Sequence, residues 1–409
     1  MSMRQMMRKT ASTMRRTVVA AALVSIAASP VYAGEVKIGV LNALTGPIPD
    51  LSAVILEAEL AAAAYINANG GMWGGDTLVL ASGDSGCDAK AGVDAATKIV
   101  NVEQASIIVG PLCSGATIGA TQAVTIPAGV VNISPSATSP AITGLDDNDL
   151  VFRVCPSDAY QGVTIAKLAR SMGYSHLAAT YANDDYNAGL HDVFVKAFEE
   201  LGGIITKDQM HEANKASYRS ELAGLSWSLE KGEPEALALF AYYNGSGITI
   251  MRQSLENGFF NKFIGGDGMI AQEVIDEIGA DNLGGAVFTK GTADTTSSHF
   301  KTFAGLFDRP SDPYTAQAWD AVMIAALALE SAGSATRDLI AHVRSVANAP
   351  GVEVGPADWA KAKALLAAGE EINYQGIAGA NEFDVNGDVA GIYGKSVVKD
   401  GKWAETLID

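Results

Sequence analysis

Short apolar runs alternate with helix-like segments along this chain, and this alternation limits the possible folds more than any other feature. The first four apolar runs are Val36–Leu41, Leu78–Leu80, Ile107–Val109 and Val130–Ile133. Between them, apolar residues recur at helical spacing, as in Ala89–Val102. Because right-handed crossovers join neighbouring parallel strands, this order predicts an α/β fold with a parallel sheet and helices on both of its faces.

The same alternation begins again after Pro156 and predicts a second α/β lobe. Its expected strands are Leu177–Tyr181, Ile204–Ile205, Ala236–Tyr242, Phe263–Ile264 and Ala286–Phe288. The tail after residue 289 is too short for a third lobe of this size, so we expect it to cover the first two. Its expected elements are a long helix at Tyr314–Ser331, a helical Ala-rich stretch at Ala335–Glu370, and a turn-rich stretch at Glu382–Lys402 with a short strand at Ser396–Val398.

The first 33 residues have the composition of a secretory signal peptide. Basic residues without any acidic one precede an apolar run at Val18–Ala28, and Val31–Ala33 matches a small-residue cleavage site. An apolar run of about eleven residues is too short to cross roughly 30 Å of hydrocarbon. We therefore expect cleavage after Ala33 and a soluble mature protein in the bacterial periplasm.

Composition and charge exclude several classes of function. Apolar residues make up 48% of the chain and charged residues 18%, which is typical of a folded globular protein. The net charge of −18 repels nucleic-acid phosphates and anionic lipid headgroups, so neither nucleic acid nor a membrane surface is an expected partner.

The sequence contains no recognisable metal, cofactor or catalytic motif. It lacks C-x-x-C and H-E-x-x-H, and its five His residues are scattered, so we expect neither a metal nor a cofactor. The Ca²⁺-like spacing Asp384, Asn386, Asp388 lacks Gly at the sixth position and has Lys395 in place of the bidentate Glu, so it reads as a turn. No G-x-S-x-G elbow or other activated nucleophile occurs, so an enzyme is not expected.

The sequence contains three cysteines, and an exported protein can keep disulfides between them. Cys87 and Cys113 follow two predicted strands, and a bridge between them would stabilise the fold by about 3 kcal/mol on loop-entropy grounds. Cys155 is left over and is expected to be a small buried side chain.

Loops at the carboxyl ends of the first four strands are the candidate ligand site, because ligands of open parallel sheets bind there. Two of these loops, Leu112–Thr117 and Ser134–Thr138, are rich in small hydroxyl residues. Hydroxyls and backbone N–H groups at a helix start can bind a carboxylate, although the same residues also serve as ordinary helix caps.

A set of short motifs, in a fixed order over more than 300 residues, adds to this reading. They are Gly39–Gly46 (GVLNALTG), Ala68–Gly71 (ANGG), Ser85–Asp88 (SGCD), Gly110–Ser114 (GPLCS), Ile133–Pro140 (ISPSATSP), Phe152-Arg153 with Gln161-Gly162, Asp184–Gly189 (DDYNAG), Gly265–Gly268 (GGDG) and Phe383–Asp388 (FDVNGD). With them the chain resembles the periplasmic solute-binding proteins of branched-chain amino-acid ABC transporters, the leucine/isoleucine/valine-binding type.

The resemblance implies a type I periplasmic binding protein with two Rossmann-like lobes, joined by three crossovers that act as a hinge. Lobe 1 would comprise residues 34–154 and 290–388, and lobe 2 residues 155–289 and 389–409. The implied protein is a monomer that closes on a free amino acid and is then recognised by permease subunits, with separate ATPase subunits because no P-loop occurs here.

The resemblance also implies a ligand site. Ser114 and the Thr138 backbone would bind the ligand carboxylate. The Ser136 carbonyl, the Thr138 hydroxyl and Asp267 would bind the ammonium group. Tyr186 and Tyr243 would close on the ligand from lobe 2, a Cys87–Cys113 disulfide would lie beside the cleft, and the further lining residues are Leu51, Leu112, Cys113, Ala137 and Tyr314.

Departures from the family pattern leave the ligand side chain open. Leu51 stands where an aromatic ring is common, and the acid is Asp267 in place of a longer Glu. A branched aliphatic amino acid is therefore the first expectation, and a small polar or more extended amino acid is an alternative. The same fold could also take an amide, a urea-like molecule or an aromatic carboxylate, or serve as a periplasmic ligand sensor.

Overall fold

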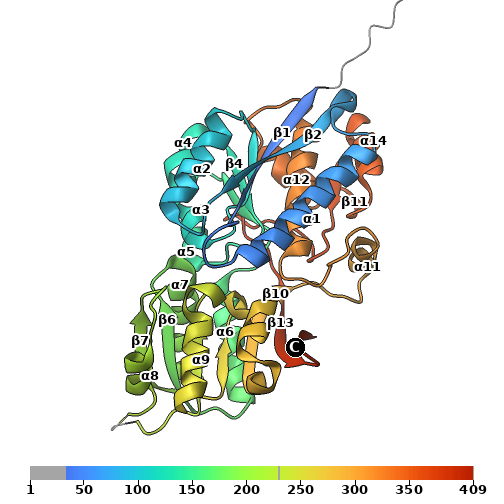
Figure 1. Ribbon diagram of the computed structural model, residues 1–409. Coiled ribbons are helices and arrows are strands. Elements are labelled where there is room, and N and C mark those ends of the chain that lie inside the picture. The colour runs from blue at the N-terminus through green and yellow to red at the C-terminus, as the bar shows by residue number, and fades with distance from the viewer. Residues whose placement is uncertain (1–33, 229–230, 409) are drawn as a thin grey trace, which may run out of the picture. The chain divides into compact units, whose positions relative to one another are not determined.

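The computed structural model describes residues 34–228 and 231–408. The expected signal peptide and its cleavage site at Ala33 lie outside the described residues. The described chain consists of α-helices and β-strands arranged around two main sheets (Figure 1).

Five strands of the described chain form the first sheet, in the order β2-β1-β3-β4-β5, and every pairing is parallel. The strands are β1 (Glu35–Asn42), β2 (Thr77–Asp84), β3 (Ile107–Val109), β4 (Val131–Ser134) and β5 (Val151–Arg153). The helices that connect them are α1 (Pro49–Ala68), α2 (Ala89–Asn101), α3 (Ser114–Ala120), α4 (Ile126–Ala128) and α5 (Pro140–Thr143).

The second sheet has the order β14-β13-β10-β9-β8-β6-β7. Its parallel strands are β6 (His176–Ala182), β7 (Ile204–His211), β8 (Ala236–Phe240), β9 (Phe263–Gly265) and β10 (Ala286–Thr292). The helices between and before them are α6 (Asp158–Ser171), α7 (Asp185–Glu200), α8 (Arg219–Leu225), α9 (Ile248–Asn257) and α10 (Gln272–Ile278). The predicted fold class, two α/β lobes with parallel sheets, is confirmed.

The chain passes between the two sheets three times: after β5, after β10, and before β13 (Ile392–Lys399). After β10 it forms α11 (Ser298–Ala304) and α12 (Thr315–Ala332), and α12 packs against α1, β3 and β4 of the first sheet. It then returns to the second sheet as β13 and β14 (Lys402–Leu407), which run antiparallel. The predicted strand at Ser396–Val398 was therefore right in kind and too short.

The prediction that Ala335–Glu370 is helical was right only in part. This segment contains α13 (Ile340–Ala347), β11 (Val352–Val354) and α14 (Trp359–Ala367), and β11 pairs in parallel with β12 (Ile372–Tyr374). Pro350 and Pro356 interrupt the Ala-rich pattern, because proline lacks the N–H that a helix interior needs.

Helix α1 alone among the described helices is long and apolar enough, by length and composition, to cross a membrane. Its apolar character has another explanation here. Ile55, Ala58, Ala62 and Ile66 are fully buried inside the protein. Glu59 on the same helix is also fully buried, and its carboxylate accepts a hydrogen bond of 2.8 Å from Asn42 Nδ2. Helix α1 is therefore a core helix of the first lobe.

A buried histidine at the end of β7 makes the stability of the second lobe depend on pH. His211 is 3% exposed, its Nδ1 lies 2.8 Å from the Thr180 hydroxyl, and its Nε2 lies 2.8 Å from the Ser246 hydroxyl. Burial disfavours the charged ring and lowers the pKa of His211 to about 4.

We predict that the free energy of unfolding contains a term from His211 that is fully present above pH 6.5 and is lost as the pH falls toward 4, because the unfolded state then binds the extra proton. The term is up to about 3 kcal/mol. Urea unfolding of the wild type and of His211→Gln between pH 4 and 8 measures it: the difference between the two proteins should shrink with acidification. The partly exposed His299→Gln is the control, and a difference that is constant with pH would contradict the assignment.

Candidate functional site

Loops from both sheets meet at one place and carry most of the predicted ligand-binding residues. Ser114 begins α3 after β3, the segment Ser134–Thr138 follows β4, and Asp267 follows β9. Two hydrogen bonds connect the loops of the two lobes: the Tyr314 hydroxyl donates to Asp267 Oδ2 in a buried bond (2.9 Å), and Ser139 Oγ donates to the Asp185 carbonyl in a partly buried one (2.9 Å). Since Tyr314 precedes α12 on the first lobe, the Tyr314–Asp267 bond links the two lobes.

Hydroxyl groups fix the two loops of the first lobe to one another. Ser136 Oγ donates to the Leu112 carbonyl (2.9 Å), and Ser134 Oγ donates to the Pro111 carbonyl (2.6 Å). Ser114 Oγ accepts from the Ser139 N–H (3.1 Å). The buried Thr138 hydroxyl, by contrast, has no hydrogen-bond partner among the described residues. The structure therefore brings Ser114, Ser136 and Thr138 together and leaves the Thr138 hydroxyl available to a ligand.

Asp267 is a buried carboxylate with partners on both oxygens. It is 6% exposed and accepts hydrogen bonds from Gln161 Nε2 (2.9 Å) and from Tyr314 (2.9 Å). Burial raises the pKa of Asp267, and these two hydrogen bonds act in the opposite direction. Each carboxylate oxygen can accept a further bond, so Asp267 retains capacity for a positively charged group.

Sequence reasoning missed a second buried carboxylate at this place, Asp158. It is the first residue of α6 and is fully buried, and the Thr138 hydroxyl lies near its carboxylate, although the two do not form a hydrogen bond of good geometry. Its N–H donates to the Thr138 carbonyl (2.9 Å). Burial raises the pKa of Asp158 well above its usual value and the negative charge of Asp267 raises it further, whereas the Thr138 hydroxyl and the charge of Arg153 act in the opposite direction. The available signal was its position three residues before the Gln161-Gly162 motif.

The tyrosine beside Tyr186 is Tyr242. Their rings stack with centroids 5.1 Å apart and an interplanar angle of 27°. Tyr243 is also buried, but it packs in an apolar cluster with Ile48, Cys113 and Met269. Burial raises the pKa of Tyr243 to about 12, and the charge of Asp50 contributes.

A small apolar cluster adjoins Asp267. It contains Leu112, Cys155 and Tyr314 together with Ile55, Ala58 and Ala318, and Leu51 packs against it. Tyr314 has φ of 63°, a left-handed conformation that is uncommon for a bulky residue and that recurs at ligand-binding and active sites. Burial raises the pKa of the Cys155 thiol, so this side chain is a buried apolar group.

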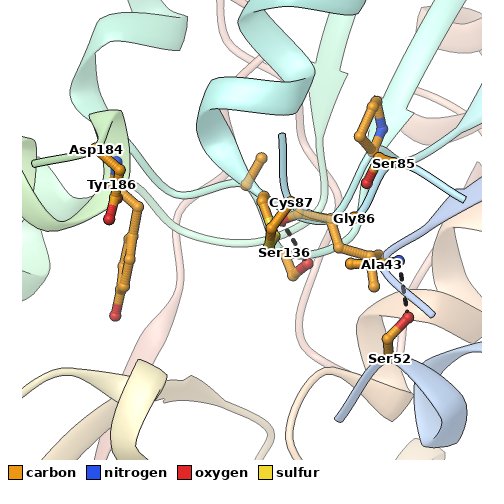
Figure 2. Close-up of a disulfide and its surroundings, with 12 residues drawn as sticks. Ala43, Ser52, Ser85, Gly86, Cys87, Ser136, Asp184 and Tyr186 are labelled. Atoms are coloured by element: carbon orange, nitrogen blue, oxygen red, sulfur yellow. Dashed lines mark hydrogen bonds between the residues drawn. A yellow bond between two sulfur atoms is a disulfide. The ribbon is translucent and has the colours of Figure 1, made fainter. Parts of the chain in front are cut away.

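The disulfide predicted between Cys87 and Cys113 is present, with a Cα–Cα distance of 5.2 Å. Cys113 directly precedes Ser114 at the start of α3, so the bridge joins the loop after β2 to a candidate ligand-binding residue. Figure 2 shows Ser136 beside the disulfide and Tyr186 on the other lobe. The described residues contain no group of three or more His, Cys, Asp or Glu side chains arranged to hold a metal ion.

Two α/β lobes with buried polar groups where their loops meet define a two-lobed ligand-binding protein of the type I periplasmic class. The chain belongs to the family described as the receptor family ligand binding region, whose model matches residues 54–394.

Individual relatives agree with this class. The chain is 30% identical to the Leu/Ile/Val-binding protein BraC3 of Rhizobium johnstonii. The match covers 78% of this chain and 86% of that protein. Two solved structures share the fold. The leucine-binding protein LivK of Thermotoga maritima has a TM-score of 0.76 at 23% identity, covering 91% of this chain and 99% of that one. A solute-binding protein of R. palustris in complex with benzoate has a TM-score of 0.71 at 17% identity, covering 91% and 96%.

We predict that replacing Cys87 and Cys113 together by Ser lowers the free energy of unfolding by about 3 kcal/mol, because the bridge closes a loop with a sequence separation of 26 residues. Denaturant unfolding of the wild type and the double variant measures the loss. Thiol titration in denaturant is the control: both proteins should show one reactive thiol, that of Cys155. Equal stability of the two proteins would contradict the prediction.

Proposed function

We propose that this protein is the substrate-binding component of an ABC importer that captures a free amino acid, branched-chain or related, in the periplasm and delivers it to a membrane permease. The observation that carries the proposal is the pair of buried carboxylates, Asp158 and Asp267, next to the unpartnered Thr138 hydroxyl. The relatives named for binding leucine, isoleucine and valine support it.

The charges at the site favour a ligand with an ammonium group. A buried carboxylate without a positive partner costs several kcal/mol, and two of them in one site repel each other. An ammonium group between Asp158, Asp267 and the Thr138 hydroxyl would offset this cost with up to three hydrogen bonds. The ligand carboxylate would take the hydroxyl of Ser114 and the backbone N–H of Thr138.

The apolar cluster favours an aliphatic side chain on the ligand. Leu51, Leu112, Cys155 and Tyr314 offer carbon and sulfur surface, and burying a leucine-sized side chain against such groups contributes roughly 1.5–3 kcal/mol. The ring of Tyr186, stacked on Tyr242, would cover the ligand from the second lobe.

Delivery would follow from closure of the two lobes about their three crossings. The ligand shifts this equilibrium only by its extra affinity for the closed form, and the closed form would be what the permease subunits recognise. The protein would act as an exported monomer after removal of residues 1–33, with ATP hydrolysis on separate subunits. No bond of the ligand is made or broken, so the proposal includes no enzymatic role. The lobe boundaries at residues 154, 289 and 388 stay predictions.

Another solute is the competing proposal, because the same fold occurs in a benzoate-bound relative. A benzoate or urea-like ligand would bring no cation to Asp158 and Asp267, so these carboxylates favour the amino acid.

We predict that an aliphatic L-amino acid raises the melting temperature of the refolded, ligand-free wild type, whereas benzoate, urea and 4-aminobutyrate do not. A ligand at 100 times its Kd stabilises by about 2.7 kcal/mol. Asp267→Asn should lose the shift, since the amide brings no charge to the ammonium group. Asp276→Asn, which changes an exposed carboxylate on α10, is the matched control and should keep it. A response only to benzoate or urea, or an equal response of Asp267→Asn, would contradict the amino-acid assignment.

A further prediction concerns two buried carboxylates, Asp158 and Asp320, that differ in how well they are hydrogen-bonded. Asp158→Asn should stabilise the ligand-free protein at pH 7, because it removes an unpartnered buried acid, and should weaken amino-acid binding. Asp320 on α12 accepts hydrogen bonds from Tyr374 and from the N–H groups of Ile377 and Ala378. Asp320→Asn should therefore lower the free energy of unfolding by about 1–3 kcal/mol and leave the Kd unchanged. Chemical unfolding and calorimetric titration measure both quantities, and a destabilising Asp158→Asn with unaltered affinity would refute the role of Asp158.

A further inference from the structure

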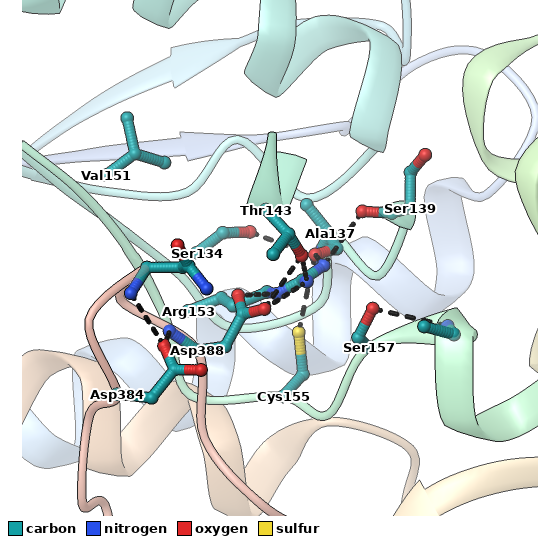
Figure 3. Close-up of polar contacts among 12 residues, drawn as sticks. Ser134, Ala137, Ser139, Thr143, Val151, Arg153, Cys155, Ser157, Asp384 and Asp388 are labelled. Carbon is teal, nitrogen blue, oxygen red and sulfur yellow. Dashed lines mark hydrogen bonds and ion pairs between the residues drawn. The ribbon is translucent and has the colours of Figure 1, made fainter. Parts of the chain in front are cut away.

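A fully buried arginine at the end of β5 donates hydrogen bonds from all three of its guanidinium nitrogens to groups around the candidate site (Figure 3). Arg153 Nε and Nη2 donate to the two carboxylate oxygens of Asp388, at 2.6 and 3.0 Å. Nη2 also donates to Thr143 Oγ1 (2.6 Å), whose hydroxyl in turn donates to Asp388 (2.7 Å). Nη1 donates to the carbonyls of Ser139 (2.9 Å) and Ala137 (3.4 Å). The ion pair with Asp388 therefore fixes the guanidinium, and the guanidinium holds the loop after β4.

The two carbonyls that Arg153 holds are on either side of Thr138. The Ala137 carbonyl and the Thr138 N–H belong to one peptide unit, and in a trans peptide these two groups point in opposite directions. A guanidinium that binds the Ala137 oxygen therefore turns the Thr138 N–H away from itself. The next peptide unit is fixed independently, because the Thr138 carbonyl accepts from the Asp158 N–H and the Ser139 N–H donates to Ser114.

We propose that Arg153 is a positioning residue for ligand recognition: held by Asp388, it orients the Ala137–Thr138 peptide so that the Thr138 N–H meets the ligand carboxylate. The inference rests on the proposed function and deepens it, since it assigns a role to a residue that does not touch the ligand. Its chemistry requires arginine. A lysine ammonium is a single point of charge and cannot bind a carboxylate through two parallel bonds while also reaching two carbonyls.

A second arginine of the first lobe offers a matched comparison. Arg344 on α13 pairs with Asp149 and donates to the carbonyls of Phe383 and Asp384. It thus has the same kinds of partner, a carboxylate and two carbonyls, and among the described residues it forms no hydrogen bond with the loop Ser134–Ser139. The Arg344 side chain is 26% exposed and that of Arg153 is fully buried, so Arg344→Lys controls for the loss of an arginine–carboxylate pair away from the loop, and the melting temperatures account for the difference in burial.

The experiment compares Arg153→Lys, Arg344→Lys and the wild type by calorimetric titration with two probes, L-leucine and L-leucinamide. The amide keeps the ammonium group and the side chain and lacks the carboxylate. Thr143→Val is a milder second variant, because it removes one hydroxyl from the Arg153–Asp388 pair and leaves both charges. Each variant's melting temperature is measured in parallel, so that affinities are compared among folded proteins.

We expect Arg153→Lys to weaken leucine binding about tenfold, the effect of losing one hydrogen bond to a charged group, and to weaken leucinamide binding much less. The preference for leucine over leucinamide should therefore fall in Arg153→Lys, fall slightly in Thr143→Val, and stay at the wild-type value in Arg344→Lys. A change that restores only the stability of Arg153→Lys should not restore the preference for leucine over leucinamide.

Two outcomes overturn the inference. If Arg153→Lys and Thr143→Val weaken both probes equally or not at all, Arg153 has only a structural role, while leucine binding by the wild type still supports the proposed function. If the wild type binds no amino acid, the proposed function fails and the inference fails with it. The two failures are distinguished by the wild-type titration alone.

Discussion

The burial of two carboxylates in one site is the constraint on which the rest of this structure depends. Asp158 and Asp267 are nearly or completely removed from solvent, and the charge of Asp267 acts on Asp158. Hydrogen bonds from Gln161 and Tyr314 offset part of the cost at Asp267, and the Thr138 hydroxyl and the charge of Arg153 offset part of it at Asp158. The remaining cost is the physical reason that a positively charged ligand would stabilise the closed arrangement of the lobes.

The loops around these carboxylates are held by contacts from distant parts of the chain. The disulfide joins the loops after β2 and β3, and the pair of Arg153 and Asp388 joins the loop after β4 to the segment before β13. Parallel strands end at one edge of their sheet, so the loops that follow them are neighbours without being consecutive. Each loop needs a fixed geometry because hydrogen bonds weaken steeply with misalignment.

The sequence predicted the two α/β lobes more accurately than it predicted the helices and strands after residue 289. Alternating strands and helices gave both parallel sheets, because the periods of two and 3.6 residues are local signals. The stretch Ala335–Glu370 was partly misread because alanine favours helices, while the pairing of β11 with β12 depends on residues 20 positions apart. Asp158 was missed because an Asp at the start of a helix is common, since it interacts favourably with the helix dipole. Its burial cannot be recognised from the sequence.

By itself the sequence determined the α/β class, the two repeats of the strand–helix pattern and the hydroxyl-rich loops, because each follows from residues close together in the chain. Only the tertiary structure decided that Tyr242 stacks on Tyr186, that Tyr314 reaches Asp267 from the other lobe, and that Arg153 holds the carbonyls beside Thr138. These contacts join residues separated by 14 to 56 positions. Their geometry is set by how helices and sheets pack, which local spacing does not encode.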